Sequence, residues 1–213
     1  MSTWQSQHNK PIPIQDSGEI DELFQVFFSF IRQLVDISPE DQALCRTYFT
    51  PVFVKKGSLL ESAGSIHNFH NFIVSGYMRN FHYDAAGKEV TTDLNDGPRF
   101  FTSYSSFINR TASNESLHCL SDCKLLRITR EDNEEITQAG KDSQLYLQKI
   151  LQHQLETSRQ RILDVNTLTA KERYLKLVQN QPAIIEHVPI NYIASYLGIN
   201  PGSLSRIRQE ISG

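Results

Sequence analysis

The sequence predicts an α+β fold in which an antiparallel β-structure is flanked by helical segments. The main observation is a change of hydrophobic period: it is helical before Pro51 and again after residue 140, while short β-branched and aromatic runs separated by Gly, Asn and Asp fill the middle. The composition of the 213 residues, 39% hydrophobic and 21% charged, is that of an ordinary globular protein. A last observation, an 18-residue pattern near the C-terminus, adds a helical domain.

The N-terminal segment is expected to hold a polar leader and two helices. Residues 1–18 are polar and lack a basic stretch followed by an apolar one, so we expect no secretory signal. Apolar residues from Ile20 to Val35 recur at helical spacing, which predicts one buried face. Ser38-Pro39-Glu40-Asp41 then has the pattern of a helix start, with Ser as N-cap, Pro at the first position and acids in the first turn.

The middle of the chain is expected to form many short antiparallel strands, as in a sandwich or barrel. Asp84-Ala-Ala-Gly87 is typical of a hairpin turn, because glycine accepts the positive φ that such turns need. The expected strands include residues 52–54, 69–74, 77–83, 89–94 and 125–128.

A long helix is expected from Lys141 to Val165, where neither Gly nor Pro occurs. Its apolar residues follow the heptad spacing of a coiled-coil seam, which favours pairing with a second copy. Packing of the same seam on the chain's own barrel is the alternative. The predicted interface consists of Leu147, Leu151, Leu155, Ser158, Ile162 and Val165.

Three more helices are expected after the long one. Thr169-Ala-Lys-Glu172 is a capping box that starts a helix running to about Gln179, before Pro182. A second helix is expected over 190–197, and Asn200-Pro201 start the last one, which runs to about Ile211.

The segment from Ile190 to Ile207 has what two closely crossing helices need. Ala194 is small where the backbones approach, and Gly198 can take positive φ at the turn. Apolar residues fill the angle between the helices, and short polar or basic residues point outward from the second one. This predicts a helix-turn-helix, with a plain helical hairpin as the alternative.

In a helix-turn-helix, the N-terminal half of the second helix enters the major groove of DNA. Arg206 can donate two parallel hydrogen bonds to guanine, while Ser203 and Ser205 can reach a base edge or a phosphate. Asn200 at the helix N-terminus suits a phosphate, and Arg208 is either a phosphate contact or a solvated charge. The formal net charge is −6 over residues 1–140 and +3 over residues 141–213. The basic C-terminal part therefore favours a polyanionic partner.

The order of β-structure, long helix and helix-turn-helix resembles the Crp/Fnr superfamily of transcription regulators over about residues 20 to 211. The stretches that carry the resemblance are Val54-Lys-Lys-Gly-Ser-Leu-Leu60, Phe72-Ile-Val-Ser-Gly-Tyr-Met-Arg79, Gly87-Lys-Glu89, Thr169-Ala-Lys-Glu-Arg-Tyr-Leu175, Tyr192-Ile-Ala-Ser-Tyr-Leu-Gly-Ile199 and Leu204-Ser-Arg-Ile207.

The resemblance implies a β-roll sensor domain like a cyclic-nucleotide-binding domain over 19–140, a dimerisation helix over 141–166 and a helix-turn-helix domain over 167–213. It further implies a cytoplasmic, non-enzymatic homodimer that binds double-stranded DNA at a two-fold site. RNA polymerase would be a partner, and a small molecule would be the effector, if there is one. No apolar stretch of 18 residues occurs, so we expect no membrane span.

The sequence departs from the members of that family that bind cyclic AMP. Thr102-Ser103 replace the Gly-Glu of the phosphate-binding loop, and counting back from Ile128 puts the family's Arg position at Ser113 or Asn114. Arg110 would reach the phosphate only with a rearranged loop, so we expect a different ligand or none. The predicted ligand-pocket residues are Thr102, Ser103, Arg110, Thr111 and Asn114.

Further departures limit the cofactors and the DNA contacts. Cys45, Cys119 and Cys123 are too few for a four-cysteine iron–sulfur cluster, and no histidine pattern requires haem, so we expect no cofactor and no metal. The segments on either side of the helix-turn-helix are too short for wing strands, so we expect the DNA backbone to be contacted from the helices, including Lys171, Arg173 and Lys176. Gly202 lies where some members have an acidic base reader, so their operator preference does not transfer.

Two other readings stay open. A cupin-like barrel that binds a ligand or a metal, with a vestigial DNA domain, would need several His and carboxylate side chains converging inside the barrel. His67, His70 and His82 match no spacing that supports this. A protein-interaction module with a decayed DNA domain is the third reading, although the helix-turn-helix pattern shows no damage.

Overall fold

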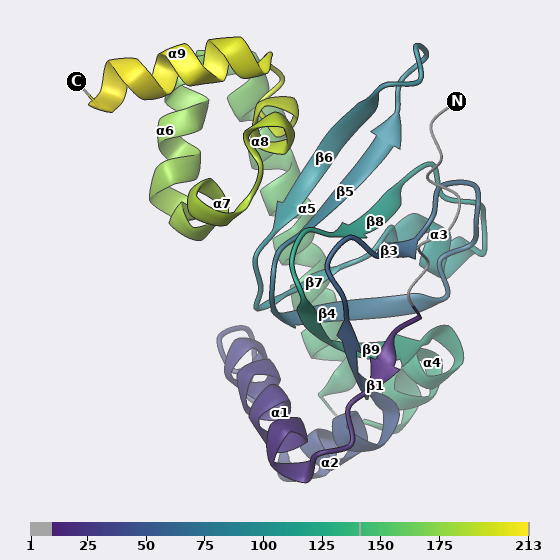
Figure 1. Cartoon of the computed structure of the whole chain (residues 1–213). Coiled ribbons are helices and arrows are strands. Elements are labelled where there is room, and N and C mark those ends of the chain that lie inside the picture. The colour runs from purple at the N-terminus through teal and green to yellow at the C-terminus, as the bar shows by residue number, and fades with distance from the viewer. Residues whose placement is uncertain (1–9, 141, 213) are drawn as a thin grey trace.

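The computed structural model describes residues 10–140 and 142–212. Two antiparallel sheets form a β-roll, helices cover its lower sheet, and a helical C-terminal domain lies beside the upper sheet (Figure 1). The strands are β1 (Ile12–Pro13), β2 (Thr50–Val54), β3 (Leu59–Glu61), β4 (Phe69–Ser75), β5 (Met78–Tyr83), β6 (Glu89–Asn95), β7 (Arg99–Phe101), β8 (Ser116–Cys119) and β9 (Cys123–Thr129). The helices are α1 (Ser17–Ile31), α2 (Pro39–Tyr48), α3 (Tyr104–Asn109), α4 (Arg130–Ala139), α5 (Ser143–Thr167), α6 (Ala170–Asn180), α7 (Pro182–His187), α8 (Ile190–Tyr196) and α9 (Pro201–Ser212).

The two sheets divide the strands unequally. One sheet has the order β1-β2-β9-β4-β7 and the other the order β3-β8-β5-β6, so β6 lies at an edge. The apolar core between them includes Ile73, Met78, Leu117 and Leu125, none of which is exposed. The β5–β6 hairpin turns at Asp84–Gly87 as predicted, with Gly87 at φ 76°.

A second core joins the five-stranded sheet to the helices below it. Phe24, Phe27 and Phe28 of α1 pack on Phe72 and Phe100 of the sheet, and the ring centroids of Phe27 and Phe72 are 5.0 Å apart. Residues from α2, α4 and the first turns of α5 complete this core. The apolar residues that recur at helical spacing in α1 therefore form a buried aromatic layer.

The predicted helices and strands are present, with shifts of a few residues at their ends. Ser38 caps α2 by accepting from the backbone N–H of Asp41 at 3.2 Å, as the sequence indicated. Residues 1–9 of the predicted leader lie outside the described residues, as does residue 141 of the predicted long helix. The rest of the leader is not wholly irregular, because Ile12–Pro13 pair with β2 and α1 begins at Ser17.

Several short elements escaped the sequence analysis. Helix α4 has only two apolar residues, Ile136 and Ala139, which are too few to show a repeated helical spacing in the sequence. Helix α7 begins at Pro182, which the sequence analysis used only as the end of the preceding helix. The missed strands β1, β3, β7 and β8 have two to four residues each, too few for a periodic signal.

Candidate nucleic-acid interface

Helix α6 starts at the predicted capping box. The hydroxyl of Thr169 accepts from the backbone N–H of Glu172 at 3.3 Å, and the carboxylate of Glu172 accepts from the backbone N–H of Thr169 at 2.8 Å. These hydrogen bonds hold the pKa of Glu172 below its ordinary value. The capping box fixes where the C-terminal domain begins after α5.

A tight turn joins α8 to α9. Gly198 has φ 70°, and the backbone N–H of Ile199 donates to the carbonyl of Ala194 at 3.0 Å. Ala194 and Leu204 are fully buried between the helices. A side chain at Gly198 would meet open space, so steric crowding does not require glycine there. The turn needs glycine because of its positive φ. The other apolar residues predicted to fill the angle between α8 and α9 belong to the same hydrophobic cluster, namely Ile193, Leu197, Ile199 and Ile207.

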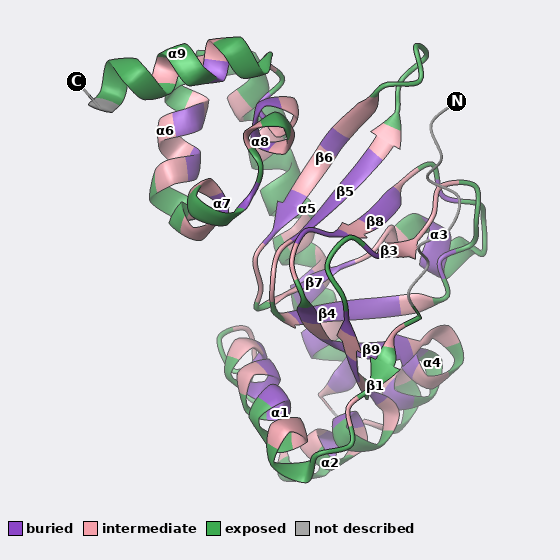
Figure 2. Ribbon diagram, in the orientation of Figure 1, coloured by how far each residue is buried: buried purple, intermediate pink, exposed green. Residues whose placement is uncertain are grey.

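Helix α9 presents its polar face to solvent. Asn200 caps it, with Oδ1 accepting from the backbone N–H of Ser203 at 2.8 Å. Gly202, Ser205 and Arg206 are exposed, and the Ser205 hydroxyl donates to the carbonyl of Pro201 at 3.0 Å. The exposed face of α9 is visible as a mostly green helix in Figure 2. The predicted DNA-reading residues Asn200, Gly202, Ser203, Ser205, Arg206 and Arg208 therefore all lie on α9 or its cap.

Two of the basic residues predicted to contact the DNA backbone behave differently. Lys171 is exposed and forms a surface ion pair with Glu210 at 3.4 Å. A DNA phosphate could replace Glu210 as the partner of Lys171, because surface ion pairs are weak. Arg173 donates from Nη1 to the carbonyl of Leu168 at 2.7 Å and from Nη2 to the carbonyl of Leu197 at 3.0 Å. Because these bonds satisfy helix C-termini, the structure gives Arg173 a role in holding α5, α6 and α8 together.

The predicted seam of α5 divides into two parts. Leu147 packs on the aromatic core of the β-roll and Leu151 is partly buried. Beyond them, Leu155 is 70% exposed, Ile162 64% and Val165 54%. The C-terminal part of the seam thus projects apolar side chains into solvent within a single chain.

The residues predicted for a ligand pocket are scattered rather than gathered. The hydroxyl of Thr102 donates to the carbonyl of Phe69 at 3.1 Å, and Ser103 precedes α3. Arg110 has φ 53° and pairs with Glu131 of α4 at 2.7 Å, both side chains being exposed. Thr111 and Asn114 are exposed as well.

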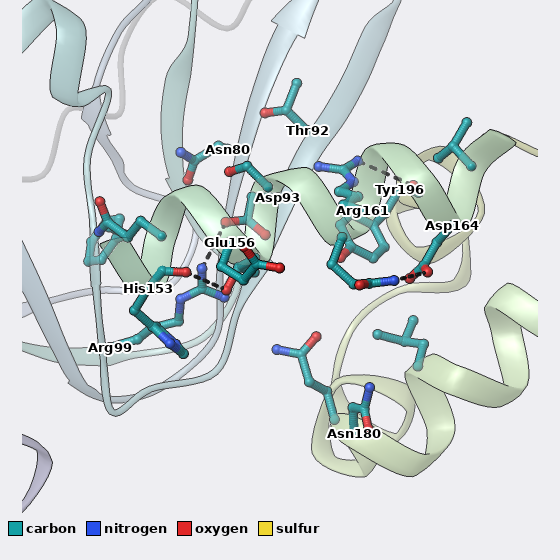
Figure 3. Close-up of a pocket in the computed structure, with 18 of the residues that line it drawn as sticks. Asn80, Thr92, Asp93, Arg99, His153, Glu156, Arg161, Asp164, Asn180 and Tyr196 are labelled. Atoms are coloured by element: carbon teal, nitrogen blue, oxygen red, sulfur yellow. Dashed lines mark hydrogen bonds and ion pairs between the residues drawn. The ribbon is translucent and has the colours of Figure 1, made fainter. Parts of the chain in front are cut away.

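A cleft of about 770 Å³ lies between the β-roll, α5 and the C-terminal domain, and of the predicted pocket residues only Thr102 lines it. Its charged side chains are largely paired: Arg99 with Asp93 at 3.2 Å, and Lys176 with Asp164 at 2.6 Å. Figure 3 shows Asp93 and Arg99 toward one end of the cleft and Asp164 of α5 toward the other.

The interior of the β-roll holds a buried polar network. Arg127 donates from Nε to Asn71 Oδ1 at 2.7 Å and pairs with Glu61 at 3.1 Å. Burial raises the pKa of Glu61 to about 7, against the opposing effect of the Arg127 charge, and lowers the pKa of Arg127 to about 10. These side chains therefore supply one another's hydrogen-bond partners inside the β-roll.

The thiols and imidazoles of the β-roll are also enclosed. Cys45, Cys119 and Cys123 are free and buried. Burial lowers the pKa of His70 to about 3 and that of His118 to about 4, so both imidazoles are neutral at pH 7. Among the described residues, no group of three or more His, Cys, Asp or Glu side chains is arranged to hold a metal ion. No helix in the described ranges is both long and apolar enough to cross a membrane.

The two-sheet roll, the long helix and the C-terminal helices define the class of fold, and comparison with solved structures agrees with it. No protein-family model and no curated protein sequence matches the chain. Structures do match: the c-di-GMP-responsive global regulator CLP of Xanthomonas campestris has TM-score 0.65 at 14% identity, covering 82% of this chain and 92% of its own. FixK2 of Bradyrhizobium japonicum has TM-score 0.65 at 14% identity, covering 77% and 84%.

A protein of Eubacterium rectale assigned to the Crp/Fnr family of transcriptional regulators has TM-score 0.63 at 15% identity, covering 83% of this chain and 84% of its own. The resemblance inferred from the sequence is thereby confirmed for the fold, which is that of Crp/Fnr-like regulators with a cyclic-nucleotide-binding type of β-roll.

The sequence analysis missed the residues that connect the β-roll to the C-terminal domain. Arg79 and Thr91 on the sheet, and Tyr192 and Ser195 on α8, meet across this boundary. The sequence of β5, Met78-Arg-Asn-Phe-His-Tyr83, mixes apolar with polar residues, so nothing local singles out Arg79 as buried.

Proposed function

We propose that this protein is a homodimeric transcription regulator that reads a two-fold DNA site with α9. The observation that carries the proposal is the exposed polar face of α9, which begins at a capped N-terminus and includes Arg206. A guanidinium in this position can donate to both O6 and N7 of a guanine in the major groove.

The backbone of the DNA would be contacted from the ends of the helices. The N-terminus of α9 offers the positive end of its helix dipole to a phosphate. Lys171 and Arg208 would add charge on the same domain, which fits a salt-dependent contribution to binding. Arg173 is left out of this interface because its donors are used inside the domain.

A second copy of the chain is the proposed partner of α5. Leu155, Ile162 and Val165 are apolar and solvent-facing, and their spacings of seven and three residues are those of a coiled-coil seam. Burying them against the same residues of another copy would place two α9 helices about a two-fold axis. Such a pair would have to reach operator half-sites about 34 Å apart.

The proposed sensor role of the β-roll does not include cyclic AMP. Thr102 and Ser103 supply no carboxylate for a ribose hydroxyl, and Arg110 is paired with Glu131 away from the cleft. An effector of another class, and contact with RNA polymerase at promoters, belong to the proposal as the roles that this fold commonly has.

Selection of bound sequences from a random duplex pool tests the proposal. Purified protein without added ligand is expected to recover a palindrome with two equal half-sites. Recovery of sequences without symmetry, or retention that disappears uniformly with salt, would contradict the proposed function. Sedimentation of the protein on the recovered duplex then gives the number of copies bound.

A further inference from the structure

Arg79 is the largest fully buried side chain of the β-roll, at 2% exposure, and it lies on the face of the sheet that meets the C-terminal domain. Its guanidinium forms an ion pair with Glu89, and Nε donates to Nδ1 of His118 at 3.2 Å. The ring of Tyr192, from α8, lies 3.7 Å from the guanidinium carbon. A side chain of the sensor domain is therefore covered by an aromatic ring of the C-terminal domain.

A hydrogen bond lies beside this stacked pair. The backbone N–H of Thr91 donates to the hydroxyl of Ser195 at 2.9 Å. Thr91 lies on β6, the edge strand of its sheet, where outward-facing N–H groups lack a neighbouring strand. Helix α8 thus fills the place that another strand or water would take.

Apolar and polar contacts continue the boundary on both sides. Leu94 and Leu120 of the β-roll belong to the same hydrophobic cluster as the core of the C-terminal domain. Gln181 donates to Asp96 at 3.1 Å, and the ring centroids of Tyr77 and His187 are 4.8 Å apart.

The long helix holds α8 from another direction. The Arg161 guanidinium carbon lies 4.3 Å from the ring centroid of Tyr196, and Nη2 donates to the Tyr196 carbonyl at 3.4 Å. Helix α8 is therefore fixed against both the β-roll and α5; Figure 1 shows it beside β6.

This boundary covers α8 and leaves α9 open. Tyr192 and Ser195 are partly buried, whereas Gly202, Ser205 and Arg206 on the next helix remain exposed. A contact that masked DNA reading would be expected to cover the second helix of the motif rather than the first.

We propose that Arg79, Thr91, Tyr192 and Ser195 form an interdomain latch that holds α9 in the DNA-reading position. The inference rests on the proposed function, and within it Arg79 and Tyr192 are positioning residues. When both domains are fixed, binding of one half-site by the dimer brings the second α9 helix to its half-site at a high effective concentration. A domain free to rotate would lose this advantage on a palindrome, while its affinity for a single half-site would not change.

The test compares Tyr192→Ala with the unaltered full-length protein on the palindrome recovered by selection and on a duplex with one half-site. The variant is expected to bind the palindrome at least about tenfold more weakly, with half-site affinity unchanged. Hydrogen exchange of the Thr91 amide is expected to become faster, because Ser195 no longer stays beside it. Tyr83→Ala is the matched control, since Tyr83 lies at the end of the same strand as Arg79 and is 53% exposed.

The outcomes separate the latch from the proposed function. If the unaltered protein recovers no palindrome, the proposed function fails. If it does and Tyr192→Ala binds the palindrome equally well or better, the latch does not position α9 and the inference is wrong. Equal losses on both duplexes would assign Tyr192 to direct DNA contact and also overturn it. Ser195→Ala, which removes one hydroxyl, gives the same comparison if circular dichroism shows that Tyr192→Ala is misfolded.

Discussion

The interior of the β-roll and the outer face of α9 use arginine side chains in opposite ways. In the β-roll, Arg79 and Arg127 are buried and surrounded by partners of the same domain or of α8. On α9, Arg206 and Ser205 stand on an exposed face. Buried charges are retained only where they are paired, whereas exposed polar groups remain available to a partner. The two buried arginines therefore maintain the structure, whereas Arg206 belongs to the proposed DNA-reading surface.

The long helix α5 belongs to both regions. Its first turns contribute Tyr146 and Ile150 to the core of the β-roll, while Leu155 and Ile162 face solvent. One helix thus changes from an intramolecular to a proposed intermolecular contact along its length. Single substitutions can therefore act on one of these regions and leave the other intact.

The largest effect is expected from Leu155→Lys on the solvent-facing seam. Each copy would lose the burial of a leucine, about 2 kcal/mol, and two like charges would meet across the two-fold axis. The protein is expected to sediment as a monomer and to bind the palindrome no better than a half-site. Gln152→Lys, exposed on another face of α5, is the control; a dimer mass for Leu155→Lys would contradict the seam.

Arg127→Met tests the inward charge of the β-roll. Loss of the guanidinium leaves Glu61 and Asn71 without their donor in the interior, so the free energy of unfolding in urea is expected to fall by about 3 kcal/mol. The double variant Arg127→Met with Glu61→Leu should recover part of this loss. If the free energy of unfolding of the single variant fell by less than about 1 kcal/mol, the Arg127–Glu61 pair would contribute no more than a surface ion pair, which would contradict this prediction.

Acid is expected to weaken the β-roll through His70. The folded pKa of about 3 lies below the unfolded value of about 6.5, so the unfolded chain binds more protons between these values. The stabilisation that comes from neutral, buried His70 is fully present above pH 6.5 and is lost progressively as the pH falls toward 3. Thermal unfolding measured from pH 7 to pH 4 should show this decline, and His70→Leu should make it shallower. An equally steep decline in the variant would assign it to other groups.

Arg206→Ala tests the outward charge of α9. Specific binding is expected to weaken by about 1–3 kcal/mol, with relaxed selectivity at one position of each half-site. Arg32→Ala removes an exposed arginine far along the chain from α9 and should leave operator binding unchanged. Equal losses on specific and random DNA would instead assign Arg206 to a phosphate.

The smallest effect is expected from Thr169→Ala at the start of the C-terminal domain. Loss of the N-cap hydroxyl should reduce stability by about 1 kcal/mol, measured by urea unfolding. Thr47→Ala is the matched control, because the Thr47 hydroxyl donates only to the Ala43 carbonyl within its own helix. Equal changes in the two variants would mean that the capping box adds nothing specific.

Most of the elements that carry the fold could be predicted from local pattern. The caps at Ser38, Thr169 and Asn200 are signals of a few residues whose hydrogen bonds lie within one turn, and each is present. The Gly198 turn was likewise predictable, because it depends on the φ of one residue. The residues on the exposed face of α9 followed from helical periodicity once that turn was located.

The ligand-pocket prediction shows where local pattern is insufficient. Arg110-Thr111-Ala112 matches a family tripeptide, yet the side chain of Arg110 is directed to Glu131, more than twenty positions away along the chain. Where a loop side chain points depends on neighbours brought by other elements, which a linear motif does not specify. Arg173 gives the same lesson: its charge suggested a phosphate, whereas the packing of α5, α6 and α8 supplied carbonyls.

By itself, the sequence determined the order of the longer helices and strands, the cap residues, the apolar spacing along α5 and the polar face of α9, because hydrogen bonds and periodicity within a segment control them. Only the tertiary structure decided that Arg79 of β5 lies beneath Tyr192 of α8, and that Thr91 donates to Ser195. These contacts join residues about a hundred positions apart. They form because the unpartnered edge of one sheet and the uncovered face of one helix become complementary only after both domains have folded.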